Sequence, residues 1–250
     1  TAIKSRVPVI NFFDGFRTSH EIQNVEFISD EDWSKLIDQE QLEAFRKSAL
    51  NPHSHPVTRG GAENDDIYFQ GREAQNTHFA KVVSVAEEYF KEASRLTGRT
   101  YAPFVYYGAE DAERVIVAMG SVTECIREVV DALNANGEKV GLVKVHLYRP
   151  FSATHLVNAI PASVKKIAVL DRTKETGALG EPLYLDVVAA LAQEGREVEV
   201  VLGGRYGLSS RDTQPKHIKA VYDFLDAEKQ WTGFTVGIND DVTHLSIPVD

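Results

Sequence analysis

The second half of the chain alternates short apolar runs with longer amphipathic stretches. The apolar runs predict strands over 104–108, 113–120, 139–150, 165–173 and 197–204. The amphipathic stretches predict helices over 121–137, 152–161, 180–195 and 214–227. Strands separated by helices of roughly 10–15 residues are typical of βαβ units. Residues 104–226 therefore predict an α/β fold whose mostly parallel sheet is covered by helices on both faces.

The first hundred residues have a different rhythm. The apolar run RVPVINFF, residues 6–13, predicts a short strand covered on both faces, and Asp14-Gly15 ends it. Thr18 and Glu21 have the spacing of a capping box at a helix start. Ser29 or Asp30 can cap a further helical stretch that continues to Leu50.

A long loop and a long helix complete this half. Residues 51–66 are rich in Pro, Gly, Asn and Asp and have no apolar periodicity, so they predict a loop. Apolar residues at 3/4 spacing predict a helix over 73–98, and Gly98 is a fitting C-terminal stop. We expect a domain junction at about residues 98–103.

Composition narrows the class of protein. A hydrophobic fraction of 43% and a charged fraction of 26% are those of an ordinary folded chain. The net charge of -10 and the absence of a Lys/Arg run argue against nucleic acid and anionic membranes as partners. The sequence has no bilayer-length apolar stretch or signal peptide, which favours the cytoplasm. The single Cys125 lies at helical spacing and is expected to be a small buried hydrophobe.

Candidate chemistry lies at three strand exits, because ligands of such sheets bind outside the carboxyl ends of the strands. Gly120-Ser121 opens a helix and is compatible with a phosphate site or with a plain capped turn. A charged loop with Arg172 and Lys174, followed by Gly177 and Gly180, suits either a functional site or a domain interface. Residues 203–212 form a third glycine-rich exit.

Other motifs are uninformative about catalysis. GxGxxG, GxSxG, HExxH, CxxC and a P-loop are absent from the sequence. His53 and His55 have no acidic or cysteine partner at a recognisable ligand spacing, so no metal site is expected. In FFDGFRTSHE, residues 12–21, a turn and a cap explain most positions. Arg17 and His20 are left over, and both could meet an anion or a partner domain.

Several longer stretches carry a family resemblance. FFDGFRTSHE, VGLVKVHLYRPF, RTKETGALGEPLYLDV, GGRYGLSS and FTVGINDDVTHLSIP occur in this order along the chain. Together they resemble the pyruvate:ferredoxin (flavodoxin) oxidoreductase family from Arg6 to Pro248. The resemblance implies a fragment of a longer, thiamine-dependent enzyme that converts pyruvate to acetyl-CoA.

The resemblance also implies a division into parts. Residues 1–100 resemble the C-terminal part of the first domain, on the pyrimidine side of thiamine diphosphate. Residues 101–232 resemble a transketolase C-terminal-like α/β domain with a doubly wound sheet, and residues 233–250 an exit segment toward a third domain. The full-length family uses thiamine diphosphate, Mg²⁺, [4Fe-4S] clusters and CoA, transfers electrons to ferredoxin or flavodoxin, and is expected to form homodimers.

No catalytic or metal-binding residue is assigned within the chain, and no cofactor is expected in it. The remaining domains of the same enzyme are its expected partners, and five residues are candidates for interdomain or substrate-side contacts: Arg17, His20, Glu21, Arg172 and Lys174. One alternative is a stand-alone module that binds a nucleotide or CoA at Gly120-Ser121 or at the Gly177 loop. Another is the related domain of a sulfite reductase subunit.

Overall fold

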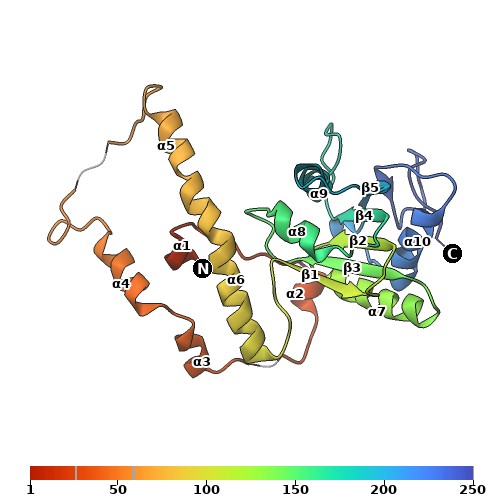
Figure 1. The fold of residues 1–250 in the computed structure, drawn as a ribbon, viewed down its shortest axis with the longest axis horizontal. Coiled ribbons are helices and arrows are strands. Elements are labelled where there is room, and N and C mark those ends of the chain that lie inside the picture. Colours follow the sequence, from red (N-terminus) through yellow and green to blue (C-terminus); the bar gives the residue numbers. More distant parts are fainter. Residues whose placement is uncertain (26, 58–59, 250) are drawn as a thin grey trace. The chain divides into compact units, whose positions relative to one another are not determined.

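The computed structural model describes residues 1–25, 27–57 and 60–249, with the side chain of Arg17 outside the described part. The chain forms two compact units (Figure 1). The first contains residues 1–11 and 23–102, and the second contains residues 12–22 and 103–250. Residues 12–22 therefore belong with the second unit although the chain on both sides of them belongs to the first.

The described part of the first unit consists of helices joined by open stretches of chain. The helices are α1 (Ala2–Ser5), α3 (Asp30–Lys35), α4 (Gln39–Lys47), α5 (Tyr68–Ala74) and α6 (Asn76–Thr97). Local capping defines several ends: Ser29 accepts a hydrogen bond from the Asp32 N–H, and Asp38 accepts one from the Gln41 N–H. Gly98 closes α6 in the left-handed conformation, as the sequence predicts.

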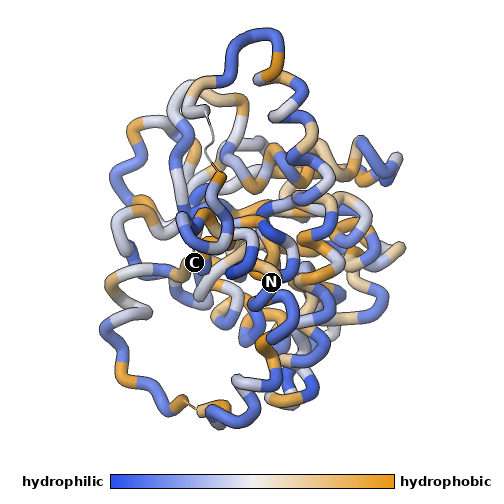
Figure 2. Tube along the Cα trace, turned by 90° about the vertical axis from the view of Figure 1, so that its left-hand side faces the viewer, coloured by the Kyte–Doolittle hydropathy of each residue, from blue (hydrophilic) through white to orange (hydrophobic). Residues whose placement is uncertain are grey.

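This unit buries little apolar surface. Among its described residues the buried apolar side chains are Val7, Val82 and Ala86. Large apolar side chains are exposed along its open stretches and helices, where Figure 2 shows recurring hydrophobic positions. They are Val9, Ile10, Val25, Phe27, Trp33, Ile37, Phe45, Leu50, Val57, Ile67, Tyr68, Phe69 and Phe79. The described residues of this unit thus do not enclose a core of their own.

Two expectations for the N-terminal region are wrong. Residues 6–13 form no strand, and Ile10 and Phe13 are 85% and 68% exposed, because this apolar run pairs with no neighbouring strand in the described structure. The capping box at Thr18 and Glu21 is also absent: α2 (Arg17–His20) begins before Thr18 and ends before Glu21. In the predicted loop over 51–66, residues 51–57 and 60–66 are largely turns and irregular chain, with an isolated bridge between Asn51 and His55, and residues 58–59 lie outside the described part.

A six-stranded sheet forms the centre of the second unit. Its strands are β1 (Phe104–Gly108), β2 (Arg114–Ala118), β3 (Val140–Val145), β4 (Lys166–Asp171), β5 (Val200–Arg205) and β6 (Phe234–Thr235). The order is β1-β3-β2-β4-β5-β6; β1 is antiparallel to β3, and the other pairs are parallel. This mixed, mostly parallel sheet confirms the predicted α/β class.

Helices cover both faces of the sheet (Figure 1). Residues of α7 (Val122–Ala135) and α10 (Pro215–Asp226) pack in one core with Ile116 and Leu202. Residues of α8 (Ala153–Ala159) and α9 (Pro182–Gln193) pack in the other with Val117 and Val169. Alternate residues of each buried strand thus face opposite cores, which explains their near-continuous apolar runs.

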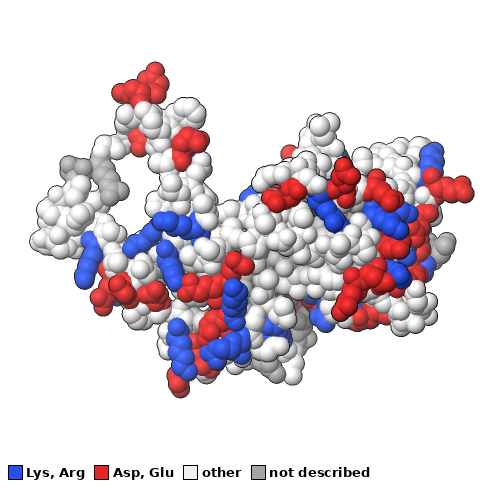
Figure 3. All heavy atoms as spheres, viewed as in Figure 1, with Lys and Arg blue, Asp and Glu red and all other residues white. Residues whose placement is uncertain are grey.

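The topology brings the carboxyl ends of β2, β4 and β5 to one edge of the sheet, because these strands are parallel neighbours. The three predicted strand exits therefore share this edge. Acidic and basic side chains are interspersed on the face of this unit seen in Figure 3. Within the described part of the chain, no helix is both long and apolar enough to cross a bilayer.

Candidate functional site

Asp14 joins two of the strand exits. Its Oδ2 accepts a 2.5 Å hydrogen bond from the Ser121 N–H, at the start of α7. Its Oδ1 lies 3.1 Å from Arg172 Nη1, just after β4. The side chains of Asp14 and Arg172 are only 14% and 23% exposed. We call these three residues, Asp14, Ser121 and Arg172, the Asp14 cluster.

The Asp14 cluster answers the question of a phosphate site at Gly120-Ser121. A phosphate at this helix start would need the Ser121 N–H, but this group already donates a hydrogen bond to the carboxylate of Asp14. A Cβ on Gly120, which has a φ of +82°, would lie 2.8 Å from Asp14 Oδ2. The glycine thus permits close approach of the protein's own carboxylate, and the geometry does not favour the nucleotide-binding alternative at this exit.

The charge of Asp14 is stabilised where it lies. Burial on its own raises the pKa of this carboxyl, but the hydrogen bonds from Ser121 and the guanidinium of Arg172 outweigh it. The pKa of Asp14 consequently lies below its ordinary value of 3.8. Asp14 is therefore ionised near neutral pH. Its negative charge is favourable both at the start of a helix and beside the arginine.

Arg172 extends the cluster to the third exit. Its Nε donates a 2.9 Å hydrogen bond to the carbonyl of Gly207, which has a φ of +62°. The neighbouring Tyr206 is buried, and its N–H donates to the Asp171 carbonyl. Burial, with a smaller contribution from Asp14, raises the pKa of the Tyr206 phenol. One arginine thus holds together the loops after β4 and β5 and the segment around Asp14.

Asp171 anchors α9 to the end of β4. This buried carboxylate accepts hydrogen bonds of 3.0 and 3.1 Å from the N–H groups of Leu183 and Tyr184 in the first turn of the helix. Burial raises the pKa of Asp171 to about 6, outweighing these hydrogen bonds, which lower it. Pro182 occupies the first helical position, as the sequence predicts.

A second buried ion pair lies beside α9. Glu181 is 2% exposed, and both of its carboxylate oxygens lie 3.3 Å from Arg205 Nη1. Arg205 Nη2 also donates a 2.6 Å hydrogen bond to the Gly233 carbonyl, which ties β5 to the start of β6. Lys174 approaches Glu181 at 3.9 Å and is about half exposed. These cations compensate the charge of a carboxylate that is almost fully removed from solvent.

The five residues predicted to make interdomain or substrate-side contacts do not lie together in one site. Arg172 and Lys174 follow the same strand but engage different carboxylates, those of Asp14 and Glu181. His20 Nδ1 lies 2.6 Å from the Phe16 carbonyl, and the His20 and Phe16 rings are 5.0 Å apart, so its side chain contacts its own segment. Glu21 is exposed after the end of α2. The side chain of Arg17 lies outside the described residues.

Sequence reasoning missed Asp14 and Glu181 as site residues, and it placed Arg205 within the third strand exit without predicting its partner. The sequence pattern predicts a turn at Asp14 and gives Glu181, in the helix predicted over 180–195, no role. The available signal was the presence of single charged residues next to glycine or proline at strand exits, where the backbone can approach closely. That signal does not identify which opposite charge each residue meets.

Comparison with known proteins gives the family. The model for the thiamine diphosphate-binding part of pyruvate flavodoxin/ferredoxin oxidoreductase matches residues 1–91. The model for core domain II of pyruvate:ferredoxin oxidoreductase matches residues 112–218. The chain belongs to the pyruvate:ferredoxin/flavodoxin oxidoreductase family. The two matches do not overlap along the chain.

Relatives in this family are similar over the whole chain. Pyruvate-flavodoxin oxidoreductase of Enterobacter agglomerans is 56% identical over 249 residues, which are 100% of this chain and 21% of that protein. Pyruvate:ferredoxin oxidoreductase of Moorella thermoacetica is 54% identical over 247 residues, 99% of this chain and 21% of that protein. The chain therefore spans about a fifth of the length of these curated relatives.

A solved structure of 2-oxoglutarate:ferredoxin oxidoreductase from Magnetococcus marinus, with 2-oxoglutarate, coenzyme A and succinyl-CoA bound, also matches. It is 19% identical with a TM-score of 0.41, and the match covers 68% of this chain and 26% of that one.

Among the described residues, the carboxyl edge of the sheet does not offer free charged groups for the diphosphate of thiamine diphosphate. At the carboxyl edge, Arg172 and Arg205 are paired with carboxylates of the chain, and Asp14 bonds the start of α7. In the part of the chain that the structure describes, no group of three or more His, Cys, Asp or Glu side chains could hold a metal ion.

Proposed function

We propose that this chain is part of a pyruvate:ferredoxin/flavodoxin oxidoreductase, in which it forms the end of the first domain and the second domain. The whole enzyme oxidatively decarboxylates pyruvate with thiamine diphosphate, forms acetyl-CoA, and passes electrons to ferredoxin or flavodoxin. The observation that carries the proposal is the 56% identity, over 249 residues, to a pyruvate-flavodoxin oxidoreductase. Mg²⁺, [4Fe-4S] clusters, CoA binding, a homodimer and a cytoplasmic location belong to the same proposal.

Within that enzyme the chain is a structural part rather than the catalytic centre. Residues 1–100 complete the first domain, residues 101–232 form the second, and residues 233–250 lead onward. The large apolar side chains exposed in the first unit support this role, because a unit with so little buried surface needs further protein to cover it. The parts of the longer polypeptide that this chain does not include supply that cover.

The Asp14 cluster has an interdomain role in this proposal. Residues 12–22 belong to the second unit, whereas residues 1–11 and 23–102 belong to the first. The polypeptide therefore connects the two units at three points along the chain, after residues 11, 22 and 102. Asp14 fixes this segment to both α7 and the β4 exit. Arg172 and Lys174, with His20, Glu21 and Arg17 of the anchored segment, are the proposed contact residues toward the other domains.

A dye-reduction assay tests the proposal. Purified residues 1–250 should not reduce a viologen dye with pyruvate and CoA, whereas the full-length enzyme that contains this chain should do so. Replacing pyruvate by 2-oxoglutarate in the same assay is the control for the substrate, and sulfite-dependent oxidation of the pre-reduced dye tests the sulfite reductase alternative. Robust pyruvate-dependent turnover by residues 1–250 alone would contradict the structural role. A full-length enzyme that uses sulfite but not pyruvate would contradict the assigned chemistry.

A further inference from the structure

The outer side of β5 is only partly covered by the next strand. β6 has two residues, which pair with Gly204 and Arg205 at the carboxyl end of β5. One residue further back, the Gly203 N–H donates to Thr232 Oγ1 and the Gly203 carbonyl accepts from the Gly233 N–H. The chain at 232–235 thus covers β5 from Gly203 onward and leaves its first residues open.

The direction of the N–H and carbonyl groups along β5 shows which of them have no hydrogen-bond partner. Val200 N–H donates to the Lys165 carbonyl and Tyr206 N–H to the Asp171 carbonyl, so the even-numbered residues face β4. Because the carbonyl and N–H of a trans peptide point in opposite directions, the Glu199 carbonyl and the N–H and carbonyl of Val201 point outward. Within the described residues, none of these three groups has a protein partner.

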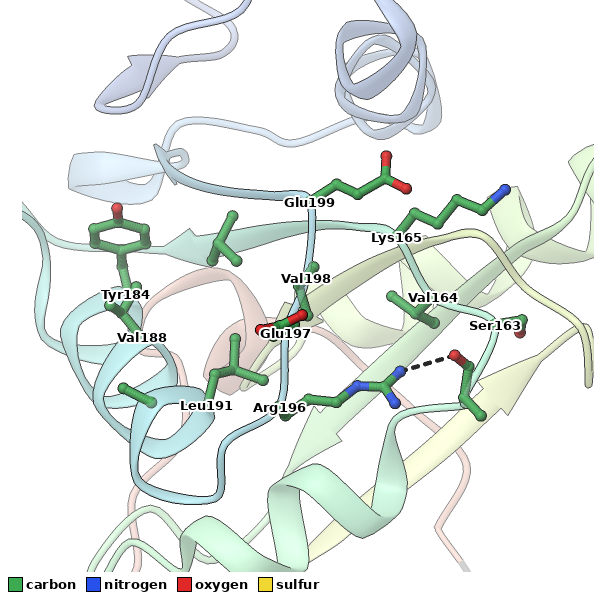
Figure 4. Close-up of a pocket in the computed structure, with 13 residues that line it drawn as sticks. Ser163, Val164, Lys165, Tyr184, Val188, Leu191, Arg196, Glu197, Val198 and Glu199 are labelled. Atoms are coloured by element: carbon green, nitrogen blue, oxygen red, sulfur yellow. Dashed lines mark hydrogen bonds between the residues drawn. The ribbon is translucent and has the colours of Figure 1, made fainter.

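An open groove adjoins this edge (Figure 4). It has a volume of about 980 Å³ and is lined by α9, by residues 162–165 just before β4, by residues 196–199 just before β5, and by Val201 of β5. Tyr184, Val188 and Leu191 of α9 and Val198 and Val201 beside them provide its apolar lining. Val188 is 39% exposed, as is Leu185 on the same helix. A strand added to β5 would place every second side chain against this surface.

The charged side chains of the groove indicate which kind of polypeptide segment could bind there. Its two basic side chains are engaged: Lys165 pairs with Glu113 at 3.3 Å, and Arg196 Nη2 donates to the carbonyls of Pro161 and Ala162. The carboxylates of Glu197 and Glu199 are exposed and form no ion pair among the described residues. The unengaged charge beside the open edge is therefore negative.

A second copy of this edge is a poor occupant. Pairing two copies of β5 would bring the carboxylates of Glu197 and Glu199 close to those of the other copy, and like charges on neighbouring strands are destabilising. An extended segment with lysine or arginine beside its apolar residues has the complementary charge. Its backbone would meet the open N–H and carbonyl groups of the edge.

We propose that the open edge of β5 and the α9 groove together bind an extended, basic polypeptide segment, which adds to the sheet as a further strand. Backbone hydrogen bonds to Val201 and the Glu199 carbonyl supply the pairing. The apolar surface around Val188 and the carboxylates of Glu197 and Glu199 supply the selectivity. This interaction is separate from pyruvate chemistry and from the Asp14 cluster.

Amide NMR of the ¹⁵N-labelled 250-residue chain tests the proposal. The probe is a capped peptide of sequence KVTVTVK, with apolar side chains on one face and lysines at both ends. We expect the largest shift changes at Val201, Leu202 and Val188, and slower hydrogen exchange at the Val201 amide. The same peptide with glutamate in place of both lysines, and a version with proline at its centre, should bind at least about fivefold more weakly.

Variants separate pairing from non-specific attraction. The double variant Glu197→Lys, Glu199→Lys should bind the lysine peptide more weakly and the glutamate peptide more tightly. The control variant Glu110→Lys, at an exposed position outside the groove, should bind both peptides as the wild type does. Val201→Pro, which removes the outward N–H, should abolish binding, and Val201→Ile should retain it.

Three results would overturn the proposal. The first is no change at Val201 with the peptide at about 1 mM, a concentration that would half-saturate a site with a Kd of about 1 mM. The second is equal binding of the lysine and glutamate peptides. The third is a set of shifts that depends on the concentration of the chain alone, which would mean that a second copy pairs with this edge. The wild-type titration decides the question even where a proline variant fails to fold.

Discussion

Replacing Asp14 by alanine should destabilise the second unit measurably. The substitution removes the acceptor for the Ser121 N–H at the start of α7, and loss of such a helix cap costs about 1 kcal/mol. It also removes the carboxylate 3.1 Å from Arg172, and a charge-assisted hydrogen bond between largely buried groups contributes roughly 1–2 kcal/mol. We therefore expect Asp14→Ala to lower the free energy of unfolding by about 2–3 kcal/mol.

Urea denaturation followed by tryptophan fluorescence measures this loss in the correct unit. Trp33 lies in the first unit and Trp231 in the second, so a Trp33→Phe background reports on the second unit alone. Trp231 packs edge-on against Phe224 and donates to the Leu245 carbonyl, which makes its emission sensitive to unfolding. Asp240→Ala, at an exposed position of the same unit, is the matched control and should change stability by less than about 0.5 kcal/mol.

A double-mutant cycle with Arg172→Met separates the ion pair from the cap. We expect a coupling energy of about 1 kcal/mol between Asp14 and Arg172. The effect of Asp14 should also depend on pH. Its pKa is lowered in the folded state, so its contribution is fully present above the ordinary value of 3.8 and is lost as the pH falls through the lower folded value. An Asp14→Ala variant as stable as the wild type at pH 7, with no coupling to Arg172, would refute this account of the cluster.

Two further predictions concern the sheet. The carboxyl ¹³C signal of Asp171 should titrate at about pH 6. Because this pKa is raised in the folded state, Asp171 stabilises the fold most at low pH, and its contribution is lost as the pH rises through 6. The Asp171→Asn variant should lose this dependence of stability on pH. A titration near pH 4 would contradict its burial. Gly204→Ala should cost roughly 1–3 kcal/mol, because the new Cβ would lie only 2.1 Å from the ring of Phe234, whereas Gly15→Ala, with nothing within 4 Å, should not destabilise the chain.

Much of the second unit was determined by local pattern. The apolar runs of β1 to β5 and the amphipathic stretches of α7 to α10 were each recognisable alone, because periodicity is set by the neighbours of a residue in the chain. Pro182 at the start of α9 and Gly98 at the end of α6 were recognisable for the same reason. The long motifs likewise indicated the family, which the comparisons confirm.

Tertiary structure alone decided what those elements meet. The run over 6–13 has the apolar composition of a strand, but a strand needs a partner, and the described structure provides none. β6 has only two residues, and it exists because Gly204 and Arg205 offer a free edge. Asp14 is separated by more than a hundred residues from Ser121 and Arg172, so its change from turn residue to buried anion depends on contacts that no local pattern contains. Periodicity thus specified the elements of this protein, whereas burial and charge pairing between distant segments decided the site.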